Sequence, residues 1–128
     1  MSEKKKRKVL IVDDDADFVE MEGEVLRKAG YDVVVAFNGD ECLEIVDREK
    51  PDLILLDIMM QTEWAGVDAA QYLREHEKTR NIPIIVVTTK PFYSIYPDEE
   101  AWSPTDEFIN KPIIPKQLVD QVEKALSK

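Results

Sequence analysis

The sequence predicts an α/β fold in which a parallel sheet of five strands carries helices on both faces. Two observations lead to this prediction. Short, wholly apolar runs recur along the chain, and they alternate with stretches whose apolar residues recur at helical spacing. A run that is apolar at every position is typical of a strand buried on both faces. Strands that alternate with helices form βαβ units with right-handed crossovers, and 128 residues suit one domain.

Each expected strand is a short apolar or β-branched run that stops at polar residues. The first run ends at three consecutive aspartates, the third at Asp57, and the fourth at Thr88 and Thr89. The expected strands are residues 9–12, 32–36, 53–56, 84–87 and 107–110.

The expected helices are bounded by residues that favour helix ends. Gly30 ends the first helix, Asn38 caps the second, and Pro115 suits the first position of the last. A third helix is expected near residues 67–77. The apolar face predicted for the first helix consists of Phe18, Met21, Val25, Leu26 and Ala29.

The alternation breaks in residues 90–106. This stretch contains Pro91, Pro97 and Pro104, and prolines at that spacing cannot lie inside one regular helix. The fourth helix is therefore expected to be short or irregular.

The composition excludes several classes of function. A net charge of −10 disfavours direct binding to nucleic acid or an anionic membrane, and no apolar run is long enough to span a bilayer. One cysteine and one histidine exclude an intrachain disulfide and the usual zinc sites. We expect a soluble, cytoplasmic protein with a basic lead-in at residues 1–7 and one domain at residues 8–128. The lead-in resembles a nuclear localisation signal, but we interpret it as a solvated approach to the first strand.

Polar residues at the strand ends form a specific set. Asp13 and Asp14 follow the first strand, Asp57 ends the third, Thr88 ends the fourth and Lys111 follows the fifth. In an open parallel sheet the carboxyl ends of the strands form the binding site. Three convergent carboxylates repel one another, and their oxygen-only ligand set favours Mg²⁺.

This set suits phosphoryl transfer, because lysine and hydroxyl groups can hold phosphate oxygens while a carboxylate acts as the nucleophile. Asp57 is the candidate nucleophile. The P-loop and dinucleotide-binding glycine motifs are absent from the sequence, as is the second aspartate of a haloacid-dehalogenase-like DxDx[TV] block. Considered without the other strand-end residues, Asp13 and Asp14 could merely cap the first helix. Thr89 is the alternative to Thr88 as the residue that supplies the hydroxyl group.

The blocks VLIVDDD, LILLDIMM, IPIIVVTT and FINKPI together resemble the receiver domains of two-component response regulators. The resemblance implies a flavodoxin-like strand order 2-1-3-4-5. It also implies that Asp57 accepts a phosphoryl group from a histidine kinase or phosphotransfer protein, and that the domain is not an enzyme beyond assisting its own phosphorylation and dephosphorylation. By the same resemblance Asp14 would ligate Mg²⁺ directly, Asp13 mainly through water, and Met59 through its backbone carbonyl.

The resemblance also assigns a switch. Thr88 would supply the switch hydroxyl, Phe108 the switch aromatic ring, and Lys111 the cation that pairs with phosphate. The chain departs from the family at Gln61, where proline is usual, and in residues 90–106, which lack the usual Gly-Ala turn. These departures keep open an alternative function, a phosphate-independent interaction module with a receiver fold.

Overall fold

The structure is a computed structural model of the 128-residue chain. It describes residues 6–57, 73, 75–77, 79–88, 107–110 and 114–127. Within these ranges, no helix has both the length and the apolar character needed to cross a bilayer. The predicted irregular helix in residues 90–106 lies outside the described residues.

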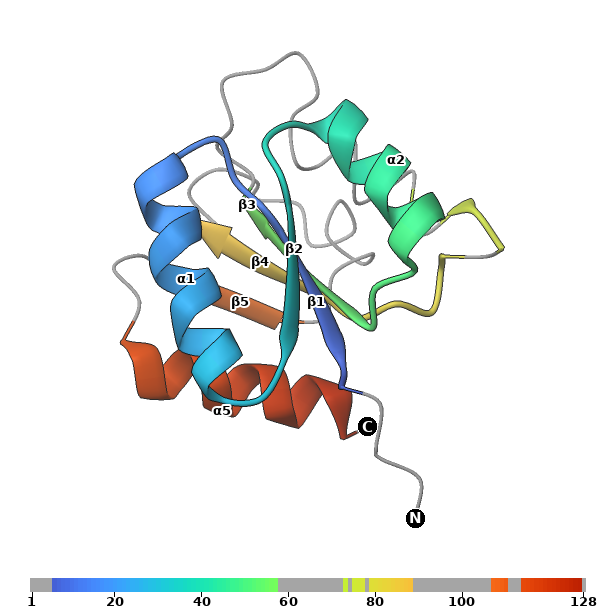
Figure 1. The fold of residues 1–128 in the computed structure, drawn as a ribbon. Coiled ribbons are helices and arrows are strands. Elements are labelled where there is room, and N and C mark those ends of the chain that lie inside the picture. Colours follow the sequence, from blue (N-terminus) through green and yellow to red (C-terminus); the bar gives the residue numbers. More distant parts are fainter. Residues whose placement is uncertain are drawn as a thin grey trace.

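The strands form one parallel sheet in the order β2-β1-β3-β4-β5 (Figure 1). Every neighbouring pair is parallel, so the carboxyl ends of all the strands share one edge. This arrangement confirms the predicted parallel α/β architecture. The strands are β1 (Lys8–Val12), β2 (Asp32–Ala36), β3 (Leu53–Asp57), β4 (Ile84–Thr88) and β5 (Glu107–Asn110).

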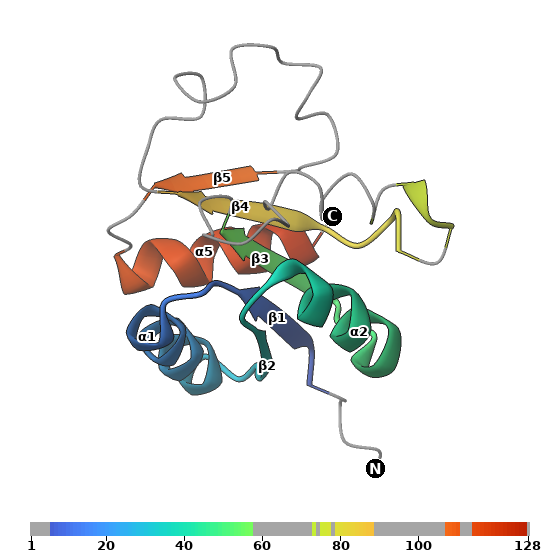
Figure 2. The same cartoon turned by 90° about the horizontal axis from the view of Figure 1, so that it is seen from above.

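Helices cover both faces of the sheet (Figure 2). The helices α1 (Ala16–Lys28) and α5 (Pro115–Leu126) lie on one face, and α2 (Gly39–Glu49) lies on the other. Each face has its own buried apolar cluster, because side chains alternate along a strand between its two sides. Ile11 of β1 packs with α1 and α5, whereas its neighbour Leu10 packs on the side of α2.

The helix ends follow the predicted capping residues. The Asn38 side chain accepts a hydrogen bond from the Glu41 amide at 2.9 Å and so caps α2. Pro115 is the first residue of α5. Gly30, with a φ of 101°, provides the left-handed conformation that ends the α1 segment.

The apolar face predicted for α1 includes the buried Leu26 but wrongly includes Ala29 and leaves out Val19. The buried residues of the helix are Val19, Glu22, Gly23 and Leu26, while Ala29 is exposed. Counting apolar residues misses Glu22 and Gly23. A Cβ atom at Gly23 would lie 3.3 Å from a guanidinium nitrogen of Arg27, whose exposed and flexible side chain could move aside.

The third helix ends earlier than predicted. Leu73 and Glu75 are helical, but His76 lies in a bend and Glu77 in a turn. The Thr79 hydroxyl donates a hydrogen bond to the Leu73 carbonyl at 2.6 Å, which satisfies one of the acceptors that a helix leaves open at its end. The rest of this predicted helix lies outside the described residues.

Candidate functional site

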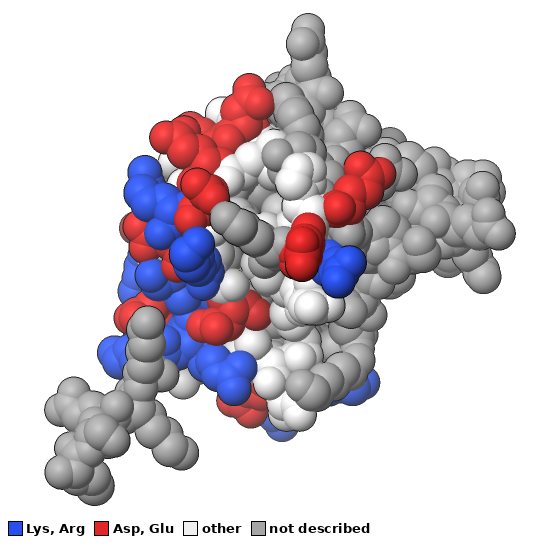
Figure 3. All heavy atoms as spheres, turned by 90° about the vertical axis from the view of Figure 1, so that its right-hand side faces the viewer, with Lys and Arg blue, Asp and Glu red and all other residues white. Residues whose placement is uncertain are grey.

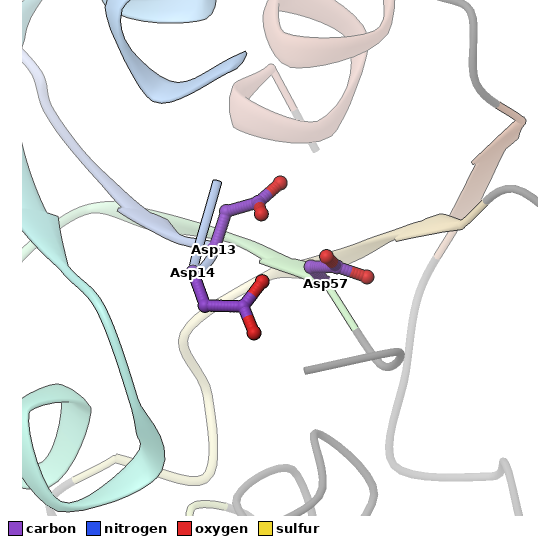
Figure 4. A group of neighbouring side chains, drawn as sticks. All are labelled: Asp13, Asp14 and Asp57. Atoms are coloured by element: carbon purple, nitrogen blue, oxygen red, sulfur yellow. The ribbon is translucent and has the colours of Figure 1, made fainter. Parts of the chain in front are cut away.

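Three carboxylates converge at the carboxyl edge of the sheet (Figure 4). Asp13 and Asp14 directly follow β1, and Asp57 is the last residue of β3. The two strands are neighbours, with Val12 opposite Leu56, so the next residues along each strand face one another. One carboxylate oxygen from each residue lies within 4.8 Å of the others.

Backbone hydrogen bonds hold Asp13 in place. Its amide donates to the Ala36 carbonyl at 3.1 Å, and its Oδ1 atom accepts from the Asp15 amide at 3.0 Å. Asp15, rather than Asp13 or Asp14, is the N-cap of α1, since its Oδ1 accepts from the amides of Asp17 and Phe18. The interpretation of Asp13 and Asp14 as caps is therefore unnecessary.

The site combines buried and accessible acid groups. Asp13 is 1% exposed and Asp57 is 5% exposed, whereas Asp14 is open to solvent. Negative charges taken out of water need a compensating partner, and a divalent cation bound by all three would supply one. Mg²⁺ prefers oxygen ligands and keeps several of its waters, which the open side at Asp14 accommodates. The residues present fit that ion.

The remaining predicted site residues are only partly described. Thr88 ends β4, one residue beyond Val87, which is paired with Asp57, so its backbone lies at the same edge. Phe108 lies in β5, paired with Val86 of β4. The side chains of both residues, and Met59, Lys111 and Thr89 entirely, lie outside the described residues.

Phe37 lies beside the acid cluster and was missed by the sequence analysis. It follows Ala36 at the end of β2, and it is 44% exposed. Its amide donates to Glu41 Oε1 at 2.9 Å, so the position of its backbone is fixed. An aromatic residue directly after a predicted strand, where polar residues are usual, is the signal that could have found it.

Comparisons with known proteins identify the class of protein. The sequence profile described as "Response regulator receiver domain" matches residues 9–123. The chain therefore belongs to the response regulator receiver domain family. It is a receiver domain of the kind found in two-component signalling, with a flavodoxin-like fold.

Solved structures with similar folds agree with this assignment. A putative response regulator from Chloroflexus aurantiacus is 31% identical, with a TM-score of 0.87 and coverage of 97% of this chain and 100% of that one. The chemotaxis response regulator CheY4 of Vibrio cholerae is 26% identical, with a TM-score of 0.85 and coverage of 95% and 100%. The signal receiver domain of a histidine kinase from Syntrophus aciditrophicus is 28% identical, with a TM-score of 0.80 and coverage of 94% and 90%.

Proposed function

We propose that this protein is a phosphoacceptor switch in which Asp57 receives a phosphoryl group from a histidine kinase or phosphotransfer protein in the presence of Mg²⁺. The observation that carries the proposal is the convergence of Asp13, Asp14 and Asp57 within 4.8 Å at two adjacent strand ends. Family membership over residues 9–123 supports it. The proposal includes a cytoplasmic location and a receiver domain that spans residues 8–128 after the lead-in at residues 1–7.

Asp13, Asp14, Asp57 and the Met59 carbonyl are the groups that would hold Mg²⁺. When bound, the ion neutralises charge on the phosphoryl oxygens and on the carboxylates. The Asp13 Oδ1 atom is already engaged by the Asp15 amide, which agrees with a mainly water-mediated role for Asp13. Asp14 is exposed to solvent, so a hydrated ion can reach its carboxylate.

The transfer itself is a nucleophilic displacement at phosphorus. A carboxylate oxygen of Asp57 forms the new P–O bond while the P–N bond of a phosphohistidine donor breaks. The departing imidazole nitrogen keeps the electron pair and takes up a proton. Burial holds the Asp57 carboxylate in one place, which reduces the entropy that must be lost before attack.

After transfer, the chain's own groups would stabilise the acyl phosphate. We assign Lys111 to pair with a phosphoryl oxygen and Thr88 to donate its hydroxyl hydrogen to another. Phe108 would then follow Thr88 inward as the second part of the switch. Phe37, exposed beside the site, offers the donor protein an apolar contact.

Labelling with acetyl phosphate and Mg²⁺, read by intact mass, tests this function. The wild type is expected to gain ~80 Da, the mass of one phosphoryl group on a carboxylate. Asp57→Asn should show no gain, whereas Asp32→Asn, a matched control at the opposite end of the sheet, should label like the wild type.

Two results would contradict the proposal. An adduct on a residue other than Asp57 would show that the nucleophile is misassigned. A wild type that remains unlabelled, with Mg²⁺ present, would instead favour the phosphate-independent interaction module.

A further inference from the structure

A groove runs along α2 on the side of the molecule that faces residues 73–82. It consists of two adjoining hollows of 440 and 340 Å³ that share Val46, Asp47 and Thr79. Figure 3 looks onto this side of the molecule and shows uncharged surface among acidic and basic side chains. None of the residues that line the groove belongs to the acid cluster, so the groove is separate from the site described above.

The floor of the groove is apolar in both hollows. Leu43 and Leu73 line the first, and Pro51 and Ile82 line the second, with Val46 between them. Leu43 and Ile82 are only partly buried against the apolar cluster beneath α2. Each hollow therefore offers apolar surface that an inserted side chain would remove from water.

The rim of the groove carries two carboxylates and one lysine, and therefore a net negative charge. Asp47 on the α2 wall and Glu77 on the opposite wall are exposed, and neither carboxylate forms an ion pair within the described part of the chain. Two cations lie nearby, and neither forms an ion pair with Asp47 or Glu77 within the described residues. Arg48 pairs with Glu49 at 3.3 Å, and Lys50 Nζ donates to the Asp47 carbonyl at 3.3 Å. A bound group that supplies positive charge would complement this rim.

The groove has the dimensions of a helix-binding site. Leu43 and Asp47 lie on α2 at helical spacing, and Lys50 follows as the C-cap of the helix. At a rise of 1.5 Å per residue, that stretch measures about 10 Å, or two turns of a helix. Two hollows along this length match two side chains of a bound helix that lie one turn apart.

We propose that this groove binds an amphipathic helical segment of a partner protein, with two large apolar side chains one turn apart and Lys or Arg beside them. The apolar side chains enter the two hollows, and the basic side chains meet Asp47 and Glu77. This inference does not depend on the phosphoacceptor function, because it uses none of the residues assigned to phosphoryl transfer.

A designed peptide provides the probe. We would use a fluorescein-labelled, alanine-based helix with two leucines one turn apart and flanking lysines, and follow its binding by fluorescence anisotropy. We expect saturable binding, with a dissociation constant against which the variants can be compared. Amide chemical shift changes should fall on residues 43–51 and 73–82.

Matched variants separate the groove from general attraction to an acidic protein. Asp47→Asn and Glu77→Gln should each weaken binding about two- to fivefold, as expected for exposed charge pairs. Asp120→Asn removes the same charge from exposed surface on α5, on the opposite face of the sheet, and should leave affinity unchanged. Leu43→Lys, with its fold checked by circular dichroism, should abolish binding, and Asp57→Asn should have no effect.

Three outcomes would overturn the inference. The lysine peptide and its glutamate-substituted counterpart would bind equally well, or Asp120→Asn would weaken binding as much as Asp47→Asn does. Alternatively, the shift changes would centre on Asp13, Asp14 and Asp57. Asp57→Asn should leave peptide binding unchanged but should abolish the mass gain in the labelling experiment. Failure of this inference and failure of the proposed function can therefore be told apart.

Discussion

The Asp13 amide donates a hydrogen bond to the Ala36 carbonyl at 3.1 Å, one residue beyond the last pair of the β1–β2 ladder. This bond extends the sheet to the point where the acid cluster begins. Asp13 is thus held by the edge strand on one side, while Asp57 stands on the neighbouring strand on the other. The backbone places these two carboxylates together, so the site requires no rearrangement of the sheet to receive an ion.

Mg²⁺ is expected to raise the melting temperature. An ion that binds only the folded state adds about 2.7 kcal/mol at a concentration one hundred times its dissociation constant. Asp14→Asn should remove most of this rise. Asp15→Asn is the control, because it changes an adjacent acid while keeping an oxygen to cap α1. Thermal scans from zero to several millimolar Mg²⁺ measure the effect, and identical curves would argue against the metal site.

Replacement of the α2 cap should destabilise the fold. Asn38→Ala removes the acceptor for the Glu41 amide and is expected to lower the free energy of unfolding by about 1 kcal/mol. Asn81→Ala, in an exposed turn, should have little effect. Urea denaturation compares the two variants. A loss no greater for Asn38→Ala than for Asn81→Ala would show that the capping bond contributes nothing in solution.

The Lys8–Glu49 ion pair should contribute a pH-dependent increment of stability. Lys8 Nζ lies 2.9 Å from Glu49 Oε1, and its hydrogen bond, followed by its charge, lowers the pKa of Glu49 below 4.5. A lowered pKa in the folded state stabilises the protein above the pKa of the unfolded chain. That contribution disappears as the pH falls through the folded value.

Lys8→Met tests this linkage. It should lower the melting temperature at pH 7 and have a smaller effect once the pH has fallen below the folded-state pKa of Glu49, because the carboxyl group is then protonated in both states. Lys28→Met, which breaks a more exposed pair with Glu24, is the comparison. An equal loss at both pH values would mean that Lys8 stabilises the strand by packing rather than by charge.

Cys42 should be unreactive in the folded protein. It is fully buried on the inner face of α2, and burial raises the pKa of its thiol to about 12. The thiolate, which is the reactive form, is therefore scarce at pH 8. Iodoacetamide should modify Cys42 rapidly in urea and very slowly without it, as read by intact mass. Rapid modification of the native protein would show that α2 opens readily.

The raised pKa of Cys42 also makes the stability of the fold depend on pH. The direction is opposite to that for Glu49, because here the stability falls as the pH rises. A thiol pKa raised by folding contributes stability below the unfolded value of 9.0, and this stability is lost as the pH rises above it. Cys42→Ala should therefore unfold with a weaker dependence on pH between 9 and 11 than the wild type does. Denaturation across that interval measures the difference.

The sequence by itself determined most of the elements and several of their ends. The β2 and β5 strands have the predicted bounds, and Asn38 and Pro115 begin their helices as predicted. These features depend on local chemistry, since strand burial, capping and proline geometry act within a few residues of the chain. The residues Asp13, Asp14 and Asp57 could also be singled out, because each ends an apolar run.

Only the tertiary structure decided which of these residues meet. The pairing of β1 with β3 brings Asp13 opposite Asp57. The residue that caps α1 is Asp15, so capping is not the role of the candidate metal ligands Asp13 and Asp14. Burial of Glu22 on α1 and the groove beside Val46 likewise depend on contacts between distant segments. The periodicity of apolar residues indicates which face of a helix or strand is buried, but it does not indicate which distant segments meet. The pattern of apolar residues could therefore not predict these contacts.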